Sequence, residues 1–169
     1  MQIHCGKAAL LLVQGKLSRA EEELTKAHAL LQGNSPSQAV LLHTLAGLET
    51  QMGRLPEAEH HQRMALELLR EQLGASHRSV MKAWISLSTI QGLRGDWKGA
   101  EQSLRQSLAI EETPEALSNY ALVLGRLKRR REAKALKSRV GQVVRPNAIV
   151  DVKAFAAGRG SADLEPVTR

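Results

Sequence analysis

The sequence predicts an all-α fold made of stacked helical hairpins. Its 169 residues are rich in good helix formers such as Ala, Leu, Gln, Glu, Lys and Arg, and only four of them are aromatic. No segment shows the apolar–polar alternation of a half-buried strand. Small residues also return at the same places in successive stretches of the chain, which is typical of a repeat architecture.

An internal repeat divides the chain into four copies. One alanine marks the start of the second helix in each copy, at successive spacings of 38, 42 and 33 residues. These alanines are Ala20, Ala58, Ala100 and Ala133. A second set of small residues on the first helices would let the two axes of each hairpin approach closely; it comprises Ala8, Ala46, Ser88 and Ala121. We therefore expect a repeat domain over residues 1–140, with copies near 1–34, 39–72, 81–113 and 114–140.

Glycine, proline and capping residues predict the helix boundaries of the first two copies. In copy one, Gly15 can adopt the left-handed conformation that ends a first helix, and the second helix starts about three residues later. Copy two opens with Pro36 after the capping candidate Ser35, and its first helix ends near Gly53. Pro56 fits the first turn of the second helix, where its missing N–H costs nothing.

Copies three and four continue the pattern. The first helix of copy three ends near Gly95, whereas copy four has Lys128 in place of the hairpin glycine. Copy four opens with Pro114 after the capping candidate Thr113.

The repeat pattern decays after residue 140. We expect residues 140–144 to extend the last helix and Pro146 to end it. Residues 149–152 predict a short extended segment. Residues 141–169 as a whole are expected to form a C-terminal extension and a flexible tail.

Two segments carry a family resemblance. Gly-Arg-Leu-Pro-Glu-Ala-Glu at 53–59 and Gly-Asp-Trp-Lys-Gly-Ala at 95–100 resemble tetratricopeptide repeats, with small residues at the eighth, twentieth and twenty-seventh places. The 42-residue spacing, and Leu73-Gly74 followed by His77, resemble the long-spaced variety of kinesin light chains and many bacterial proteins. The resemblance covers roughly residues 1–140. It implies a right-handed α-α superhelix that acts as a non-enzymatic protein–protein interaction module.

The resemblance also implies a concave groove lined by the first helices, in which a partner polypeptide would bind. The groove candidates are His43, Thr44, Gly47, Thr50, Lys82, Ser86, Thr89, Asn119 and Arg126. They are small, polar and nearly neutral, so an extended peptide backbone could approach them closely. Asn119 matches the Asn with which family members bond a peptide backbone, but the Lys/Asn/Arg clamp of chaperone-binding members is missing. A groove with no ligand in this chain stays open as an alternative.

The net charge of +7 comes from one segment. Residues 126–139 hold eight basic residues and one acid, while the rest of the chain is balanced. The core of this basic patch is Lys128, Arg129, Arg130, Arg131 and Lys134. Because no aromatic residue is interleaved for stacking, we favour a solvated solenoid end over nucleic-acid binding. The alternative is an electrostatic adaptor that docks on nucleic acid or an anionic surface through residues 126–139.

No catalytic, metal or cofactor site is expected. His60 and His61 are adjacent and would point about 100° apart on a helix, so they cannot chelate one ion together. The carboxylate runs at 21–23 and 111–112 predict solvated helix faces, the first of them in the opening turns of a helix.

Three further features concern the cellular location of the protein and whether the sequence is part of a larger chain. The single cysteine, Cys5, fits a reducing compartment, and we expect a cytoplasmic protein. The longest apolar run, residues 8–13, is too short for a membrane span. Met1 falls at the start of a repeat helix without a preceding cap, so the sequence could also be the C-terminal part of a larger chain.

Overall fold

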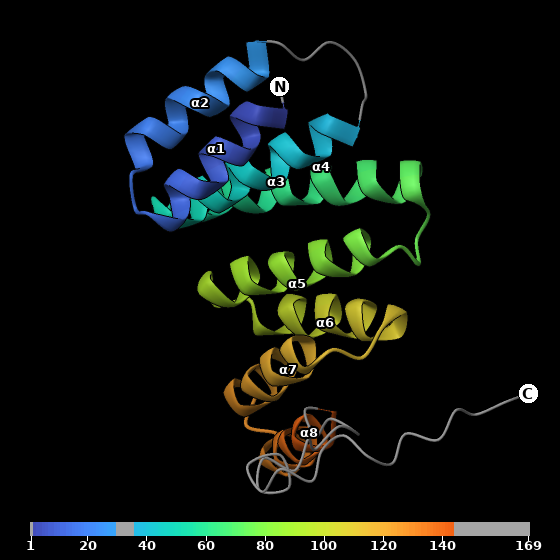
Figure 1. Ribbon diagram of the computed structural model, residues 1–169. Coiled ribbons are helices and arrows are strands. Elements are labelled where there is room, and N and C mark those ends of the chain that lie inside the picture. The colour runs from blue at the N-terminus through green and yellow to red at the C-terminus, as the bar shows by residue number, and fades with distance from the viewer. Residues whose placement is uncertain (1, 30–35, 144–169) are drawn as a thin grey trace, which may run out of the picture.

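A computed structural model describes residues 2–29 and 36–143, and these form eight helices without a strand (Figure 1). In chain order they are α1 (Gln2–Val13), α2 (Leu17–Ala29), α3 (Pro36–Gln51), α4 (Leu55–Leu73), α5 (Arg78–Leu93), α6 (Trp97–Ile110), α7 (Pro114–Arg126) and α8 (Arg130–Val143). The predicted all-α fold is therefore confirmed. Ser35, Pro146 and the expected extended segment and tail lie outside the described residues.

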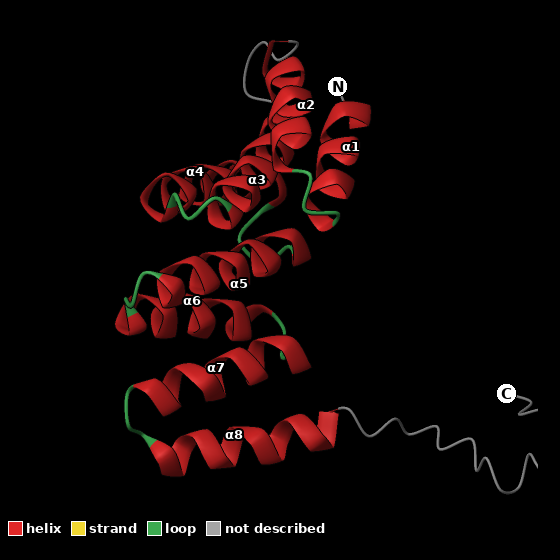
Figure 2. Cartoon of the chain, turned by 90° about the vertical axis from the view of Figure 1, so that its left-hand side faces the viewer, coloured by secondary structure: helices red, strands yellow, loops and turns green. Residues whose placement is uncertain are grey.

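Consecutive helices pair into four hairpins, which stack one upon the next along a single axis (Figures 1 and 2). The last helix extends to Val143, as expected. The first helices α3 and α5 begin at Pro36 and Arg78, about one turn before the residues at which copies two and three align.

All four hairpin turns place one residue in the left-handed region. Gly15, Gly53 and Gly95 have φ values of 69°, 75° and 83°, which cost glycine nothing. Lys128 takes the same conformation in the last turn with φ 62°, although a Cβ makes it unfavourable. The turn is thus built identically in every copy, and copy four builds it under strain.

Side-chain caps begin three of the later helices. Thr113 Oγ1 accepts a hydrogen bond from the backbone N–H of Ala116, as predicted. Asp96 caps α6 by accepting from Gly99 N–H at 2.9 Å, and His77 Nδ1 caps α5. A side chain at Gly99 would collide with the Asp96 carboxylate, which explains this glycine.

The core consists of small residues inside each hairpin and of apolar side chains that pack against them from the next hairpin. Ala58 and Ala100 are fully buried, which confirms the predicted close helix contacts. Ile90 of α5 packs against Ala58, and Val123 of α7 packs against Ala100. Each new hairpin is therefore held by a side chain that enters the groove of the one before it.

The carboxylates at 21, 22, 111 and 112 are exposed, as expected for solvated helix faces, but Glu23 is not. Glu23 is only 5% exposed and its carboxylate bonds Lys7 and Lys26. It lies beyond the first turn of α2, which contains no acidic residue, so the helix dipole is not what stabilises it. His61 is also half-buried, with Nδ1 at 2.8 Å from Glu49 Oε2. In both places the opposite helix of the hairpin supplies a partner that a helical pattern alone does not show.

In the part of the chain that the structure describes, no helix is both long and apolar enough to cross a membrane.

Candidate functional site

Two adjoining cavities follow the first helices of the stack. The α3–α5 cavity has a volume of about 320 Å³, and the α5–α7 cavity about 280 Å³. Thr89 lines both, so they form one continuous surface, which we call the first-helix groove.

The structure brings seven of the nine predicted groove residues to this surface. The α3–α5 cavity is lined by His43, Gly47, Thr50, Ser86 and Thr89. The α5–α7 cavity is lined by Thr89, Asn119 and Arg126. These side chains come from three hairpins and are separated by up to 83 positions in the sequence.

The other two predicted residues lie elsewhere. Thr44 is buried, with 7% of its surface exposed, and its hydroxyl donates to the Val40 carbonyl oxygen at 2.8 Å. It is therefore not presented to a ligand. Lys82 is exposed on α5 but lines neither cavity. The place of a residue within a repeat sets its direction on its own helix, but the neighbouring hairpins decide whether it is covered.

His43 presents a defined nitrogen to the α3–α5 cavity. The Gln62 side-chain N–H₂ donates to the Ala83 carbonyl oxygen at 3.0 Å, which leaves Gln62 Oε1 as an acceptor. His43 Nδ1 lies 2.9 Å from that oxygen and must therefore carry the proton. Nε2, the other ring nitrogen, bonds no described residue and is left for a group of the peptide backbone.

Asn119 is half-buried on α7 and lines the α5–α7 cavity. Its amide makes no hydrogen bond to any described residue. An amide can donate to a carbonyl oxygen and accept from an N–H, which is the pair that an extended peptide backbone offers.

The α5–α7 cavity is largely apolar. Leu93 and Leu122 are 58% and 56% exposed on the first helices, and Trp97 of α6 contributes its ring. The Arg126 guanidinium lies over this ring, with Cζ 5.4 Å from the centroid. The α3–α5 cavity, by contrast, is lined mainly by small and polar residues.

Sequence reasoning missed two residues because they belong to second helices. Gln62 of α4 orients His43, and Trp97 of α6 forms one wall of the α5–α7 cavity. The signal for Trp97 was present, since a large aromatic residue in the first turn of a second helix occurs in copy three only.

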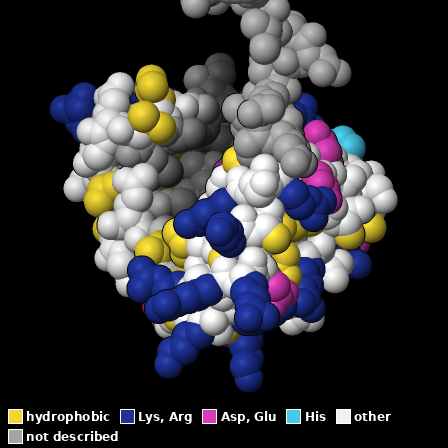
Figure 3. All heavy atoms as spheres, turned by 90° about the horizontal axis from the view of Figure 1, so that it is seen from below, with side chains coloured by type: hydrophobic (Ala, Val, Ile, Leu, Met, Phe, Trp, Pro, Cys, Tyr) yellow, Lys and Arg dark blue, Asp and Glu magenta, His cyan; other side chains and the backbone are white. Residues whose placement is uncertain are grey.

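Lys and Arg side chains gather at the end of the stack formed by α7 and α8 (Figure 3). The predicted patch nevertheless splits into two groups. Lys128 and Arg131 are exposed beside the last turn, and Arg130 and Lys134 line a third cavity. Arg129 belongs to neither group because carboxylates hold it.

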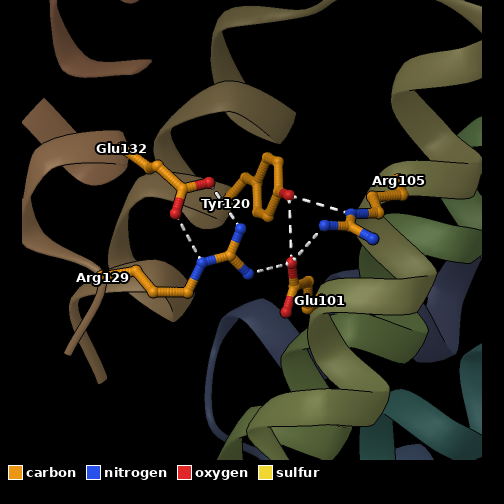
Figure 4. A network of polar contacts seen from close by, with 5 residues as sticks. All are labelled: Glu101, Arg105, Tyr120, Arg129 and Glu132. Atoms are coloured by element: carbon orange, nitrogen blue, oxygen red, sulfur yellow. Dashed lines mark hydrogen bonds and ion pairs between the residues drawn. The ribbon is translucent and has the colours of Figure 1, made fainter. Parts of the chain in front are cut away.

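Arg129 is part of a five-residue network that joins α6, α7 and α8 (Figure 4). Its Nη1 donates to Glu101 Oε1 at 2.6 Å, and its Nε donates to Glu132 Oε1 at 2.7 Å. Tyr120 donates its hydroxyl hydrogen to Glu101 and accepts from Arg105 Nε at 3.0 Å. The bonds to Glu132 and Glu101 raise the pKa of Arg129 above its usual value.

A similar arrangement surrounds Glu59, which is 6% exposed on α4. Burial by itself would raise the pKa of this carboxyl group, but hydrogen bonds from Arg63 and Arg94 outweigh it and lower the pKa. Arg94 comes from the turn of the next hairpin, so the charge pair joins two repeats.

The third cavity lies between α7 and α8 and has a volume of about 510 Å³. Its floor consists of Ala121, Gly125 and Ala133. Its rim carries Leu122, Arg126, Arg130, Lys134 and Lys137. We call it the end groove, and Arg130, Lys134 and Lys137 share this face. No carboxylate of the described residues forms an ion pair with these three cations.

Among the described residues, no group of three His, Cys, Asp or Glu side chains could hold a metal ion.

Comparisons with known proteins agree on the architecture. The sequence matches the tetratricopeptide repeat family over residues 1–71 and 37–113. The structure is similar to BtubC (BKLC) from P. vanneervenii, with a TM-score of 0.77, 18% identity, and coverage of 99% of this chain and 68% of that chain. It is also similar to a kinesin light chain-like protein with nearly identical TPR-like repeats from Podosopora anserina, with a TM-score of 0.71, 18% identity, and coverage of 94% and 87%. At these identities the likeness shows the fold alone. No curated protein matches the sequence significantly.

Proposed function

The chain belongs to the tetratricopeptide repeat family, and we propose that it is a non-enzymatic module that binds an extended segment of a partner polypeptide in the first-helix groove. Tetratricopeptide repeats typically act as scaffolds for protein–protein interactions. The finer assignment, to one groove and one kind of ligand, rests on the residues that line the two cavities.

One observation carries the proposal: the groove holds polar groups that make no hydrogen bond to any described residue. His43 Nε2 and the Asn119 amide lie in adjoining cavities, and no described residue bonds either of them. Between them, Thr50 and Thr89 donate their hydroxyl hydrogens to their own helices, so they present only small acceptor oxygens. A peptide backbone could therefore bond at both ends of the groove and lie close to its middle.

The α5–α7 cavity suggests what side chain the peptide would carry. Leu93, Trp97 and Leu122 form an apolar site of a size that suits one aliphatic or aromatic side chain. Burying that side chain would supply hydrophobic free energy, while the backbone bonds would fix direction and register.

The test is affinity capture from the native host followed by mass spectrometry, repeated with groove variants. Thr89→Arg should abolish capture of the partner, because a long charged side chain would fill the point at which the two cavities meet. Thr25→Arg is the matched control, since Thr25 is exposed on α2 and lines neither cavity of the groove. Capture that survives Thr89→Arg and Asn119→Ala, with helicity intact in both, would place the partner on another surface.

A second candidate function is the electrostatic adaptor, which the exposed cations of the end groove favour. Phosphate binding weakens steeply as salt rises, whereas binding in the first-helix groove should not. Because Glu101 and Glu132 already hold Arg129, we expect only weak binding of duplex DNA at physiological salt. We also propose a cytoplasmic location, for which the single cysteine is the only support.

A further inference from the structure

The end groove of the α7–α8 hairpin corresponds to a surface of the α5–α6 hairpin that is covered by α7. Ala133 and Lys137 of α8 correspond, at a spacing of 33 residues, to Ala100 and Leu104 of α6. In the α5–α6 hairpin, Val123 of α7 packs against this Ala100–Leu104 pair. The end groove is therefore shaped to receive a helix, just as the groove before it receives α7.

Earlier junctions follow the same rule. Ile90 of α5 packs against Ala58 of α4, and Leu48 of α3 shares a core cluster with Ala20 of α2. In every described junction, the next helix along the chain packs apolar side chains against small residues of the hairpin before it.

The rim of the groove changes its chemistry in the last copy. Three places that are apolar, amide or acidic in copies one to three become cationic in copy four. The first reads Leu17, Leu55, Trp97 and then Arg130. The second reads Glu21, Glu59, Glu101 and then Lys134. The third reads Leu24, Gln62, Leu104 and then Lys137.

The second of these places has a definite task in the other copies. Its glutamate forms an ion pair with an arginine in the turn of the next hairpin. The pairs are Glu21–Arg54 at 3.7 Å, Glu59–Arg94, and Glu101–Arg129 at 2.6 Å. Lys134 reverses this charge, so a further hairpin of the same kind would bring its turn arginine against a lysine.

We propose that the end groove is a docking surface for an acidic helix of a partner protein. The shape of the groove indicates that its ligand is a helix, because the equivalent groove at each described junction holds a helix. The charge of the groove indicates that this helix is acidic, because Arg130, Lys134 and Lys137 line the groove and no carboxylate of the described residues forms an ion pair with them. The helix inserts one apolar side chain over Ala121 and Ala133 and places carboxylates against the three cations.

A second copy of this chain fits the groove less well. Leu10 of α1 is the equivalent of Val123 and is 58% exposed, so α1 has the right apolar side chain. The turn after α1, however, carries Lys16, which would meet Lys134. Head-to-tail stacking of two copies is therefore opposed by like charges.

Nucleic acid also fits less well than a helix. The rim supplies the positive charge, but no described aromatic side chain lines the end groove for base stacking. The apolar floor, together with Leu122, would remain unused by phosphates.

The probe for the test is a modified copy of the helix that occupies the homologous groove. It is a peptide of residues 114–129 carrying Arg126→Glu and Arg129→Glu, with a side-chain cross-link between positions 118 and 122 because a helix this short is marginal alone. In the protein, Arg126 contacts Trp97 and Arg129 contacts Glu101. The residues of α8 equivalent to Trp97 and Glu101 are Arg130 and Lys134, so the two glutamates of the peptide should contact these cations. The unmodified, cross-linked peptide is the matched control.

Binding of each peptide to the full chain is measured by isothermal titration calorimetry. We expect the acidic peptide to bind at least tenfold more tightly than the control peptide. Lys134→Glu in the protein should reverse that preference, whereas Lys82→Glu, the same charge change at an exposed site of α5, should leave it unchanged. Thr89→Arg should also leave it unchanged, so a failure here is distinguishable from a failure of the proposed function in the first-helix groove.

Two results would overturn the proposal. One is equal affinity for both peptides, or a preference that Lys134→Glu does not alter while circular dichroism shows a folded protein. The other is tight binding of duplex DNA or of phosphatidylserine vesicles at physiological salt, lost in Lys134→Glu, without any preference for the acidic peptide. That result would assign the end groove to phosphate.

Discussion

The α5–α6 groove and the end groove between α7 and α8 occupy equivalent positions in the repeat, yet α7 fills the first and no described helix fills the second. Both have a floor of small residues, Ser88 and Ala100 in the first, Ala121 and Ala133 in the second. They differ at the rim, where Leu104 becomes Lys137 and Glu101 becomes Lys134. The comparison separates two properties: small residues decide that a groove exists, and a few rim side chains decide what fills it.

Exchanging one rim residue between the two grooves should have the largest effect on the free energy of unfolding. Leu104 is fully buried beneath α7, so Leu104→Lys would bury an unpaired ammonium group and should cost about 3–5 kcal/mol. The reciprocal Lys137→Leu is at an exposed site and should change stability by less than about 1 kcal/mol. Urea denaturation followed by circular dichroism measures both. Equal losses would show that the two grooves do not differ in burial.

The floor provides the next comparison. Ala58→Leu and Ala100→Leu should each destabilise by about 1–3 kcal/mol, because a close helix contact has no room for added methylene groups. Ala133→Leu should cost less than half as much, since its added atoms can extend into the open end groove. Thermal melts would decide the matter, and unchanged midpoints at Ala58 and Ala100 would mean that these alanines do not mark the contact.

Acid should weaken the internal junctions selectively. The pKa of Glu59 is lowered from 4.5, so the stability that its carboxylate contributes is present above pH 4.5 and is lost as the pH falls through the lower folded value. Glu59→Gln should cost about 1–2 kcal/mol at pH 7 and should flatten the decline in stability below pH 4.5. At the equivalent place in the end groove, Lys134→Gln should leave the wild-type decline as it is. Melting temperatures between pH 3 and pH 7 test both expectations.

The smallest expected change in stability comes from substitutions in the hairpin turns. Lys128 has a left-handed backbone that the other three copies assign to glycine, so Lys128→Gly should stabilise the protein by about 0.5–1 kcal/mol. Gly95→Ala, at the equivalent turn, should destabilise it by about 1 kcal/mol. If Lys128→Gly destabilised the protein, the lysine side chain would have a stabilising role that outweighs its backbone strain.

Local patterns predicted the helices and turns well because their causes are local. A glycine in the left-handed region, a threonine cap and a proline in a first turn each act within a few residues of themselves. The close contacts at Ala58 and Ala100 were also predictable, since a side chain that must be small in every copy leaves a periodic trace. The groove candidates, by contrast, were implied by the resemblance to tetratricopeptide repeats, and seven of the nine line the first-helix groove.

The misses involve residues whose surroundings come from another helix, either in the same hairpin or in the next one. Thr44 was expected in the groove and is buried, because exposure depends on what packs above a helix. Arg129 was expected in a solvated patch and is held by Glu101, which lies 28 positions away. The apolar wall of the α5–α7 cavity depends on Trp97, which enters from a second helix.

The sequence by itself determined that this protein is all-α, that its hairpins turn near Gly15, Gly53, Gly95 and Lys128, and that its excess charge lies at one end. It could do so because helix propensity, backbone conformation and net charge are properties of neighbouring residues. Only the tertiary structure decided which cations are paired, which groove residues are exposed, and that the open groove of the last hairpin is the one with a positive rim. Those properties depend on distances between residues far apart in the chain, and these distances are set only when the hairpins stack.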